Sequence, residues 1–195
     1  MDCAKCAAAC VVLSFWCAGC APQVAMTPRE RGESMLTHGH HQAAAYWFDR
    51  AIREDPSDGP AYVGRARARS QSINLDEWPA DRPTADLAGA LADYDPAVEL
   101  APKDSQVRAN RGVIHAVLGQ TDAALADIDD AMRLGNDPLF HGYRGLILLR
   151  AGRDQEAQVA LDRCIAEAPG AKGELRRYTS RIKSKRATAA PQAAT

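Results

Sequence analysis

Cysteine is the residue type with the most chemistry to offer in this chain, and its distribution is lopsided. Five of the six cysteines lie in the first twenty residues, namely Cys3, Cys6, Cys10, Cys17 and Cys20, and the sixth is Cys164. Cys3 and Cys6, like Cys17 and Cys20, have the pair spacing of a four-thiolate zinc site. The residues between the two pairs are mostly apolar and lack the turn chemistry of such sites. A metal or redox protein that uses these cysteines is therefore an alternative interpretation only.

The same N-terminal segment has the pattern of an export signal. Lys5 precedes an apolar run over residues 6–18, which is too short to span a bilayer comfortably. The run ends in Cys17-Ala18-Gly19-Cys20, which resembles the lipobox of bacterial lipoproteins. This resemblance implies cleavage before Cys20, lipidation of its sulfur and, with Ala21 beside it, sorting to the outer membrane. A conventionally cleaved secretory signal is the alternative.

Other reactive groups give no catalytic constellation. His38, His40 and His41 lie close together, but no carboxylate or cysteine at ligand spacing joins them, so we interpret them as polar turn residues and expect no metal site or cofactor. Gly-rich phosphate loops and the Gly-x-Ser-x-Gly and His-Glu-x-x-His motifs are missing from the sequence. We therefore expect a protein that is not an enzyme.

Charge is balanced along the chain. It carries 24 basic and 25 acidic residues, with a formal net charge of −1 and no basic stripe. Nucleic acid is therefore not an expected partner.

Arginine and aspartate recur at fixed positions of a period near 34 residues. We count positions, called offsets below, from residues 25, 59, 105 and 138. Offset 7 is always arginine and offset 25 always aspartate: Arg31, Arg65, Arg111, Arg144, Asp49, Asp95, Asp129 and Asp162. Because a guanidinium group matches a carboxylate well, we predict an Arg–Asp ladder within or between helical hairpins. An arginine-lined groove for acidic ligands is the alternative.

The same period places small residues at offsets 8, 15, 20 and 27, a large apolar residue at offset 24 and proline at offset 32. The first copy shows this as Gly32, Gly39, Ala44, Ala51, Phe48 and Pro56. The third and fourth copies agree, with Asn136 in the proline position of the third and Cys164 as a small core residue of the fourth. The second copy agrees once about twelve residues between its helices are removed. The pattern resembles the tetratricopeptide repeat family, whose repeat is a pair of helices.

This resemblance implies an all-α fold, a right-handed α-solenoid of about four helical hairpins with a C-terminal capping helix. Small residues at offsets 8 and 20 then let the two helices of a hairpin approach closely. The expected segments are a signal peptide (1–19), a tether (20–26), four repeats within 27–170 (about 25–58, 59–104 with a 12-residue insertion, 105–137 and 138–170), a capping helix (171–186) and a disordered tail (187–195).

The resemblance also implies a protein or peptide partner, bound on the concave surface formed by the first helix of each hairpin. The positions expected to contact it are Arg67, Gln106, Asn110, Val113 and Leu146. The family's lysine, asparagine and arginine set for a chain-terminal carboxylate is not present, and only Asn110 matches part of it. Within the insertion at 72–84, Trp78 either anchors a partner or folds back onto its own hairpin. Pro96 predicts a kink near Ala92.

These patterns together predict a scaffold for protein–protein interaction. We expect it to be exported and held by a lipid on Cys20 at the periplasmic face of the outer membrane. A periplasmic or cytoplasmic adaptor without lipid is the first alternative, and a metal or redox protein is the second.

Overall fold

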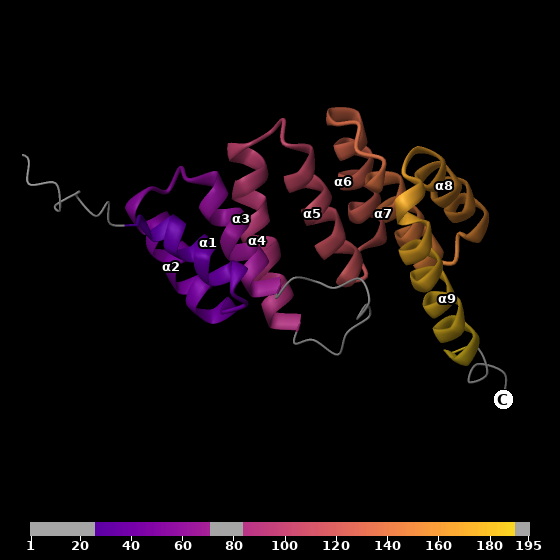
Figure 1. Cartoon of the computed structure of the whole chain (residues 1–195), viewed down its shortest axis with the longest axis horizontal. Coiled ribbons are helices and arrows are strands. Elements are labelled where there is room, and N and C mark those ends of the chain that lie inside the picture. Colours follow the sequence, from indigo (N-terminus) through magenta and orange to yellow (C-terminus); the bar gives the residue numbers. More distant parts are fainter. Residues whose placement is uncertain (1–25, 71–83, 190–195) are drawn as a thin grey trace, which may run out of the picture.

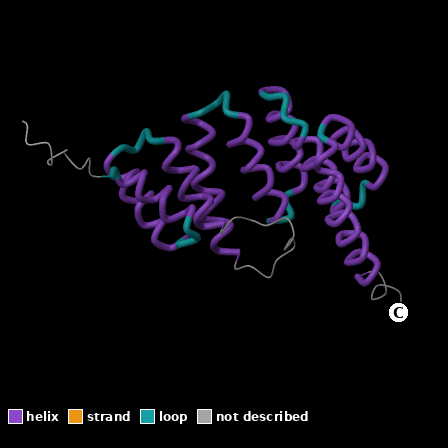
Figure 2. Tube along the Cα trace, in the orientation of Figure 1, coloured by secondary structure: helices purple, strands orange, loops and turns teal. Residues whose placement is uncertain are grey.

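Helices make up every regular element in the residues that the computed structural model describes, which are 26–70 and 84–189 (Figures 1 and 2). Their bounds are α1 (Pro28–Thr37), α2 (His41–Glu54), α3 (Gly59–Ser70), α4 (Thr84–Leu100), α5 (Ser105–Val117), α6 (Thr121–Leu134), α7 (Leu139–Arg150), α8 (Asp154–Glu167), the short 3-10 helix η3 (Pro169–Ala171) and α9 (Lys172–Ala189). None of the helices in these residues is long and apolar enough to cross a membrane. Cys20, the predicted signal and tether up to residue 25, Trp78 and most of the predicted insertion lie outside the described residues.

The first eight helices pair in chain order into four hairpins. Each hairpin joins an odd-numbered helix to the next even-numbered one, and α2, α4 and α6 each pack against the first helix of the following hairpin. Figure 1 shows the resulting row, from indigo α1 and α2 to orange α7 and α8. The predicted all-α stack of helical hairpins is confirmed.

A glycine with a left-handed backbone ends the first helix of three hairpins. Gly39, Gly119 and Gly152 have φ of 75°, 80° and 82°, a region that other residues adopt only with strain. The amide after each glycine donates to the carbonyl five residues earlier, as in Gln120 N to His115 O at 2.9 Å. This hydrogen bond satisfies a carbonyl at the helix end and turns the chain into the second helix.

Glycine also creates the close approach between helices that the repeat pattern predicts. A Cβ added at Gly64 would lie 2.4 Å from the ring of Phe48, and one at Gly32 would lie 2.9 Å from the same ring. Phe48 is fully buried between these two glycines, one from each of the first two hairpins. Gly145 stands in the same relation to Leu161, at 2.6 Å, in the fourth hairpin.

Helix α4 is continuous through Pro96, so the kink predicted near Ala92 does not interrupt it. Proline removes the amide that would have donated to the carbonyl of Ala92. Ala92 is exposed, so water can take the place of that donor.

Helix α9 follows the fourth hairpin but does not continue the stacking of the others. It packs against α7 and η3, and its Leu175 lies over Gly142 of α7. It reaches Ala189, which is three residues beyond the predicted end at 186, so the predicted tail at 187–195 is partly helical. Alanine has the strongest intrinsic helix preference, which explains why Ala187 and Ala189 extend the helix.

At the offsets that contact a neighbouring hairpin inside the stack, the outward-facing helices of the two end hairpins carry polar residues instead of apolar ones. Offset 21, which faces the following hairpin, is Leu91 in α4 and Leu125 in α6, whereas α8 carries the exposed Gln158 there. Offsets 3 and 10, which face the preceding hairpin, are the buried Val107 and Ile114 in α5. In the first hairpin these offsets hold Thr27 and Ser34. Terminal repeats with a polar outer surface are what an isolated stack needs in water.

Candidate partner-binding groove

Three arginines connect consecutive hairpins, each reaching back to an aspartate of the preceding one. Arg65 Nη1 lies 2.8 Å from Asp49 Oδ1, Arg111 Nη1 lies 3.1 Å from Asp95 Oδ1, and Arg144 Nε lies 2.9 Å from Asp129 Oδ1. The arginine is at offset 7 and the aspartate at offset 25 in every case. The ladder therefore runs between hairpins and helps to fix how each one sits on the next.

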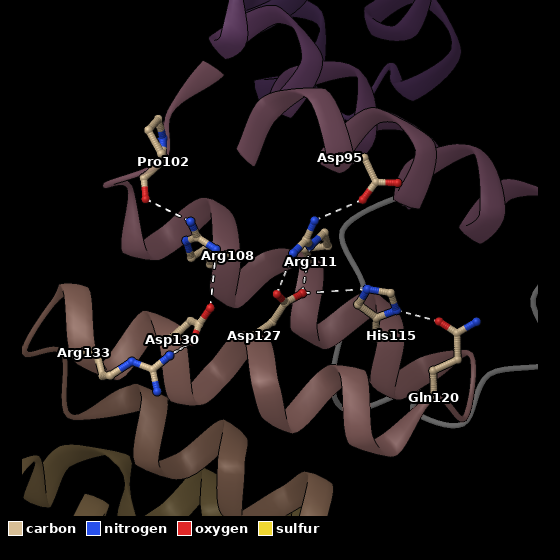
Figure 3. Close-up of polar contacts among 9 residues, drawn as sticks. All are labelled: Asp95, Pro102, Arg108, Arg111, His115, Gln120, Asp127, Asp130 and Arg133. Atoms are coloured by element: carbon tan, nitrogen blue, oxygen red, sulfur yellow. Dashed lines mark hydrogen bonds and ion pairs between the residues drawn. The ribbon is translucent and has the colours of Figure 1, made fainter. Parts of the chain in front are cut away.

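A second, buried aspartate binds the same arginine within two of the hairpins. Asp93 Oδ1 lies 2.7 Å from Arg65 Nη2, and its other oxygen lies 2.8 Å from Arg69 Nη1. Asp127 Oδ1 lies 2.7 Å from Arg111 Nη2, and its other oxygen lies 3.7 Å from His115 Nε2 (Figure 3). The hydrogen bond to Asp127 raises the pKa of Arg111, and burial acts in the opposite direction.

The structure does not bring Arg31 and Asp162 into the ladder. The Arg31 guanidinium lies 4.7 Å from the centre of the Trp47 ring, and Asp162 accepts a hydrogen bond from Gln158 at 2.9 Å. These are the first arginine and the last aspartate of the series, so Arg31 has no preceding hairpin and Asp162 no following one. The prediction was wrong at both ends of the stack for this reason.

Sequence analysis missed the residues at offset 23, which are Trp47, Asp93, Asp127 and Ala160. The residue at offset 11 could have indicated the buried aspartates, because offset 11 is basic (Arg69 or His115) in the two hairpins where offset 23 is aspartate. It is Met35 or Leu148 where offset 23 is apolar. The ladder arginines Arg65, Arg111 and Arg144 already bind carboxylates of this chain, so the alternative of an arginine-lined groove for acidic ligands does not apply to them.

A groove runs along the first helices of the hairpins, and we call it the helix-A groove. Its larger hollow, of about 600 Å³, lies among α1, α3 and α5. Apolar side chains such as Leu36 and Val63 line it together with Glu33 and Arg67. Gln106 and Asn110 complete this wall, and the Gln106 amide nitrogen donates to Asn110 Oδ1 at 3.0 Å.

A smaller hollow of about 150 Å³ continues the groove toward α7. Its lining is Arg67, Ser70, Tyr94, Asn110, Val113, Ile114 and Tyr143. Arg67 and Asn110 line both hollows, so they lie where the two meet. Burial raises the pKa of Tyr94 to about 12, with the charge of Arg67 opposing this effect. The Tyr94 phenol therefore keeps its proton at any physiological pH.

Four of the predicted partner-binding residues, Arg67, Gln106, Asn110 and Val113, line this groove. Leu146 does not, because it is 1% exposed and lies in the core cluster that includes Leu175 of α9. The prediction treated α7 as an open surface, whereas α9 packs against it. Tyr94 and Tyr143 are groove residues that the offset pattern of the first helices did not indicate.

The described residues contain no cluster of three or more histidines, cysteines or acidic residues that could hold a metal ion. His38 Nδ1 lies 2.7 Å from the carbonyl oxygen of Ser34, one turn earlier in α1. Cys164 is fully buried, and burial raises the pKa of its thiol. Its position in the core agrees with a packing role.

Helices α4 to α8 are similar in sequence to a known repeat family, and the stack is similar in fold to a solved structure. The sequence model of the family described as "Tetratricopeptide repeat" matches residues 84–138 and 118–172, which span α4 to α8. Residues 84–172 are therefore similar to tetratricopeptide repeats. The crystal structure of MamA superposes with a TM-score of 0.59 over 82% of this chain and 96% of that protein, at 16% identity. This likeness shows the fold alone, an α-solenoid of helical hairpins.

Two curated proteins are similar over part of the chain. Protein FlbA of Caulobacter vibrioides is 36% identical over 81 residues, which are 40% of this chain and 14% of FlbA. Tetratricopeptide repeat protein 36 of Danio rerio is 30% identical over 88 residues, which are 43% of this chain and 47% of that protein. The chain thus spans less than half the length of either relative.

Proposed function

We propose that this protein is a scaffold that binds a partner protein by taking an extended segment of it into the helix-A groove. The observation that carries this proposal is the continuity of the groove, in which Arg67 and Asn110 join the two hollows. Its lining combines apolar side chains with a few polar groups, which is the composition of a specific binding site. Tetratricopeptide repeats bind protein partners, which supports the same function.

An extended segment suits the groove because of what its wall offers. Val63 and Val113 are half-buried and provide apolar contacts on successive first helices. Gln106 and Asn110 carry amides that can pair with the backbone of a bound chain. Side chains then add specificity, while backbone hydrogen bonds orient the segment.

A photo-cross-linking experiment tests this function. The photoreactive amino acid p-benzoylphenylalanine is placed at Val113 in the groove, and in a matched variant at Val159, which is 72% exposed on α8 outside the groove. We expect cross-links from Val113 to one extended segment of a second protein, identified by mass spectrometry. Adducts that form equally at both positions, or at Val159 alone, would contradict binding in the groove.

We also propose that the protein is exported and anchored by a lipid on Cys20. The support comes from the sequence, in which Lys5, the apolar run over 6–18 and Cys17-Ala18-Gly19-Cys20 form a lipoprotein-type signal. Mass spectrometry of the mature N-terminus tests it. We expect a diacylated cysteine at position 20, which the Cys20→Ser variant loses. A cleaved end without lipid, or retained cysteines 3–20 with bound zinc, would contradict the anchor and favour one of the alternatives.

A further inference from the structure

Helix α9 holds a large share of the positive charge of the chain. It carries seven of the 24 basic residues and only one of the 25 acidic residues, so its net charge is +6 while the rest of the chain has −7. The nearly neutral charge of the whole chain conceals this division. A helix of one sign on a body of the other sign creates a local electrostatic potential that attracts an anionic partner.

The cations of α9 whose side chains the structure describes are all exposed (Lys172, Arg176, Arg177 and Lys183). In the part of the chain that the structure describes, no carboxylate forms an ion pair with any of them. The hairpins differ, because eleven of their arginines each lie within 3.5 Å of an aspartate or glutamate oxygen. The hairpins therefore neutralise most of their own cations, whereas α9 leaves its cations to an external anion.

The apolar side of α9 is already used by the fold. Leu175 is 7% exposed and lies over Gly142 of α7, and Tyr178 is partly buried against the same core cluster. These contacts fix α9 to the stack and leave its apolar residues unavailable for insertion into another apolar phase. Any partner of α9 must therefore be recognised by charge.

Small residues occupy the side of α9 opposite Leu175, and we call this side the outer face of α9. At 100° per residue, Gly173, Ser180 and Ser184 lie within a narrow sector of the helix. All three are exposed, and a Cβ at Gly173 would meet nothing within 4 Å. Long cationic side chains beside such small residues can reach past them, so the outer face suits a broad and flat anionic surface.

The cations flank the outer face on both sides. Lys172, Arg176 and Lys183 are spaced by four and seven residues and form a row on one side, and Arg177 lies on the other side. The row borders an open hollow of about 440 Å³ between α9 and α8, to which α8 contributes Asp154 and Asp162. Asp162 accepts its hydrogen bond from Gln158 of its own helix, at 2.9 Å. The row thus faces an opening and remains accessible from outside.

We propose that the outer face of α9 docks on an anionic lipid surface, where its four exposed cations contact headgroup phosphates. The choice of a lipid surface rests on the proposed anchor at Cys20, which holds the chain at a membrane. One lipid chain gives only reversible membrane binding, and a basic patch is a second contact that stabilises it. Since α9 lies at the opposite end of the row of hairpins from α1 (Figure 1), contact at both ends would lay the stack along the membrane.

Vesicle binding tests the docking surface without the anchor. The Cys20→Ser protein is co-sedimented with vesicles of phosphatidylcholine alone or of equal parts phosphatidylcholine and the anionic phosphatidylglycerol. We expect binding to the anionic vesicles that added sodium chloride reverses, because salt screens exposed charges. Binding through the apolar run over 6–18 is the same for both kinds of vesicle. Equal affinity for both kinds therefore overturns the proposal.

A triple variant tests the assignment to α9. It neutralises three of the exposed cations, by Arg176→Gln, Arg177→Gln and Lys183→Gln. We expect its affinity for the anionic vesicles to fall at least about tenfold, since each basic residue at an anionic membrane surface contributes separately to binding. Circular dichroism checks that the variant stays helical. An unchanged affinity overturns the proposal.

The matched control removes the same number of charges from the hairpins. It replaces three exposed arginines that are paired with carboxylates there, by Arg50→Gln, Arg133→Gln and Arg163→Gln. We expect its affinity to stay within about twofold of the parent protein, because charges far from the docked surface are screened. An equal loss in both triple variants would show that net charge alone attracts the protein, and would overturn the assignment to α9.

A nucleic acid is the other common polyanion, and duplex DNA represents it as a competitor. If DNA binds the protein more tightly than the anionic vesicles do at the same salt concentration, the lipid surface is wrong. Mass spectrometry of position 20 keeps the anchor separate. Anionic vesicles that bind a chain without lipid support the docking surface and contradict the anchor. A lipidated Cys20 in a chain whose Cys20→Ser variant ignores the vesicles gives the reverse result.

Discussion

The two inner hairpins and the two end hairpins share an arginine at offset 7 but surround it differently. In the inner hairpins it binds a buried aspartate, and a second basic residue, Arg69 or His115, approaches that aspartate from offset 11. In the first hairpin the arginine stacks on Trp47. In the fourth, the position of the buried aspartate is Ala160 and offset 11 is Leu148.

Within residues 26–70 and 84–189, both buried carboxylates, Asp93 and Asp127, have two basic partners each. A buried charge is costly unless its partners and hydrogen bonds compensate for the lost water. Both inner aspartates meet that condition, and both end hairpins avoid it by using apolar residues at offsets 11 and 23 together. The inner hairpins are also the ones with neighbours on both sides, so their polar networks are shielded most.

The largest expected effect comes from breaking an inner network. Asp93→Ala leaves Arg65 and Arg69 without their shared carboxylate, and we expect a loss of about 3–5 kcal/mol in the free energy of unfolding. Urea denaturation followed by circular dichroism measures it. The control is Asp95→Ala, whose side chain is 57% exposed in its pair with Arg111 and should cost less than about 1 kcal/mol. Equal losses for the two variants would contradict the distinction between the buried and the exposed carboxylate.

The reverse substitution places a carboxylate in an end hairpin that lacks the second cation. Ala160→Asp places a charge at a buried position of a hairpin whose offset 11 is Leu148, and we expect a loss of about 2–3 kcal/mol because Arg144 alone does not compensate for it. Ala126→Asp, at an exposed position of α6, is the matched control and should change stability by less than about 0.5 kcal/mol. A neutral Ala160→Asp variant would show that one arginine is enough, and would remove the explanation for the paired residues at offsets 11 and 23.

Substitution of a turn glycine should change the free energy of unfolding by a similar amount in inner and end hairpins, because the glycine has the same left-handed backbone in both. Gly119→Ala in an inner hairpin and Gly152→Ala in an end hairpin should each cost about 1–2 kcal/mol. Gly173→Ala in α9, where a Cβ meets nothing within 4 Å, should stabilise the helix by about 0.5–1 kcal/mol. A much smaller cost at Gly152 than at Gly119, measured by the same denaturation, would show that the end hairpin is looser as a whole.

The smallest effect concerns pH and the fourth hairpin. Burial lowers the pKa of His141 from its ordinary 6.5, and the nearby charge of Arg163 lowers it further. Because the folded state resists protonation, His141 contributes stability above about pH 6.5 that is lost as pH falls through its lower folded pKa. The His141→Gln variant should therefore lose less melting temperature than the unmodified protein between pH 8 and pH 5. Identical pH profiles would show that His141 titrates normally.

Most of the fold could be predicted because tetratricopeptide hairpins depend on residue size at fixed spacing. Gly32, Phe48 and Gly39 each have one local reason for their type, which is close helix approach, space filling or a left-handed turn. The path of α9 could not be predicted, because Leu175 can pack on α7 or α8 with the same sequence pattern. In the structure Leu175 lies over Gly142 of α7 and shares a core cluster with Leu146.

The groove residues were predictable on the first helices α3 and α5, but not at Tyr94 of α4 or Tyr143 of α7. Arg67, Gln106 and Asn110 follow from their positions in the repeat, since the first helices face the same side. Tyr94 belongs to a second helix and reaches the groove only because the smaller hollow opens between α3 and α5. The ladder failed at Arg31 and Asp162 because a repeat pattern treats every copy alike, whereas terminal copies lack a neighbour.

The polar residues on the outer faces of the end hairpins also limit where further hairpins can be added during evolution. A further hairpin added after Glu167 would meet Gln158 where the interior has leucine, and one added before Pro28 would meet Thr27 and Ser34. Duplication of an interior copy such as 105–137 creates no such mismatch, because each new interface repeats an existing one. The number of hairpins inside the stack therefore sets the length of the groove.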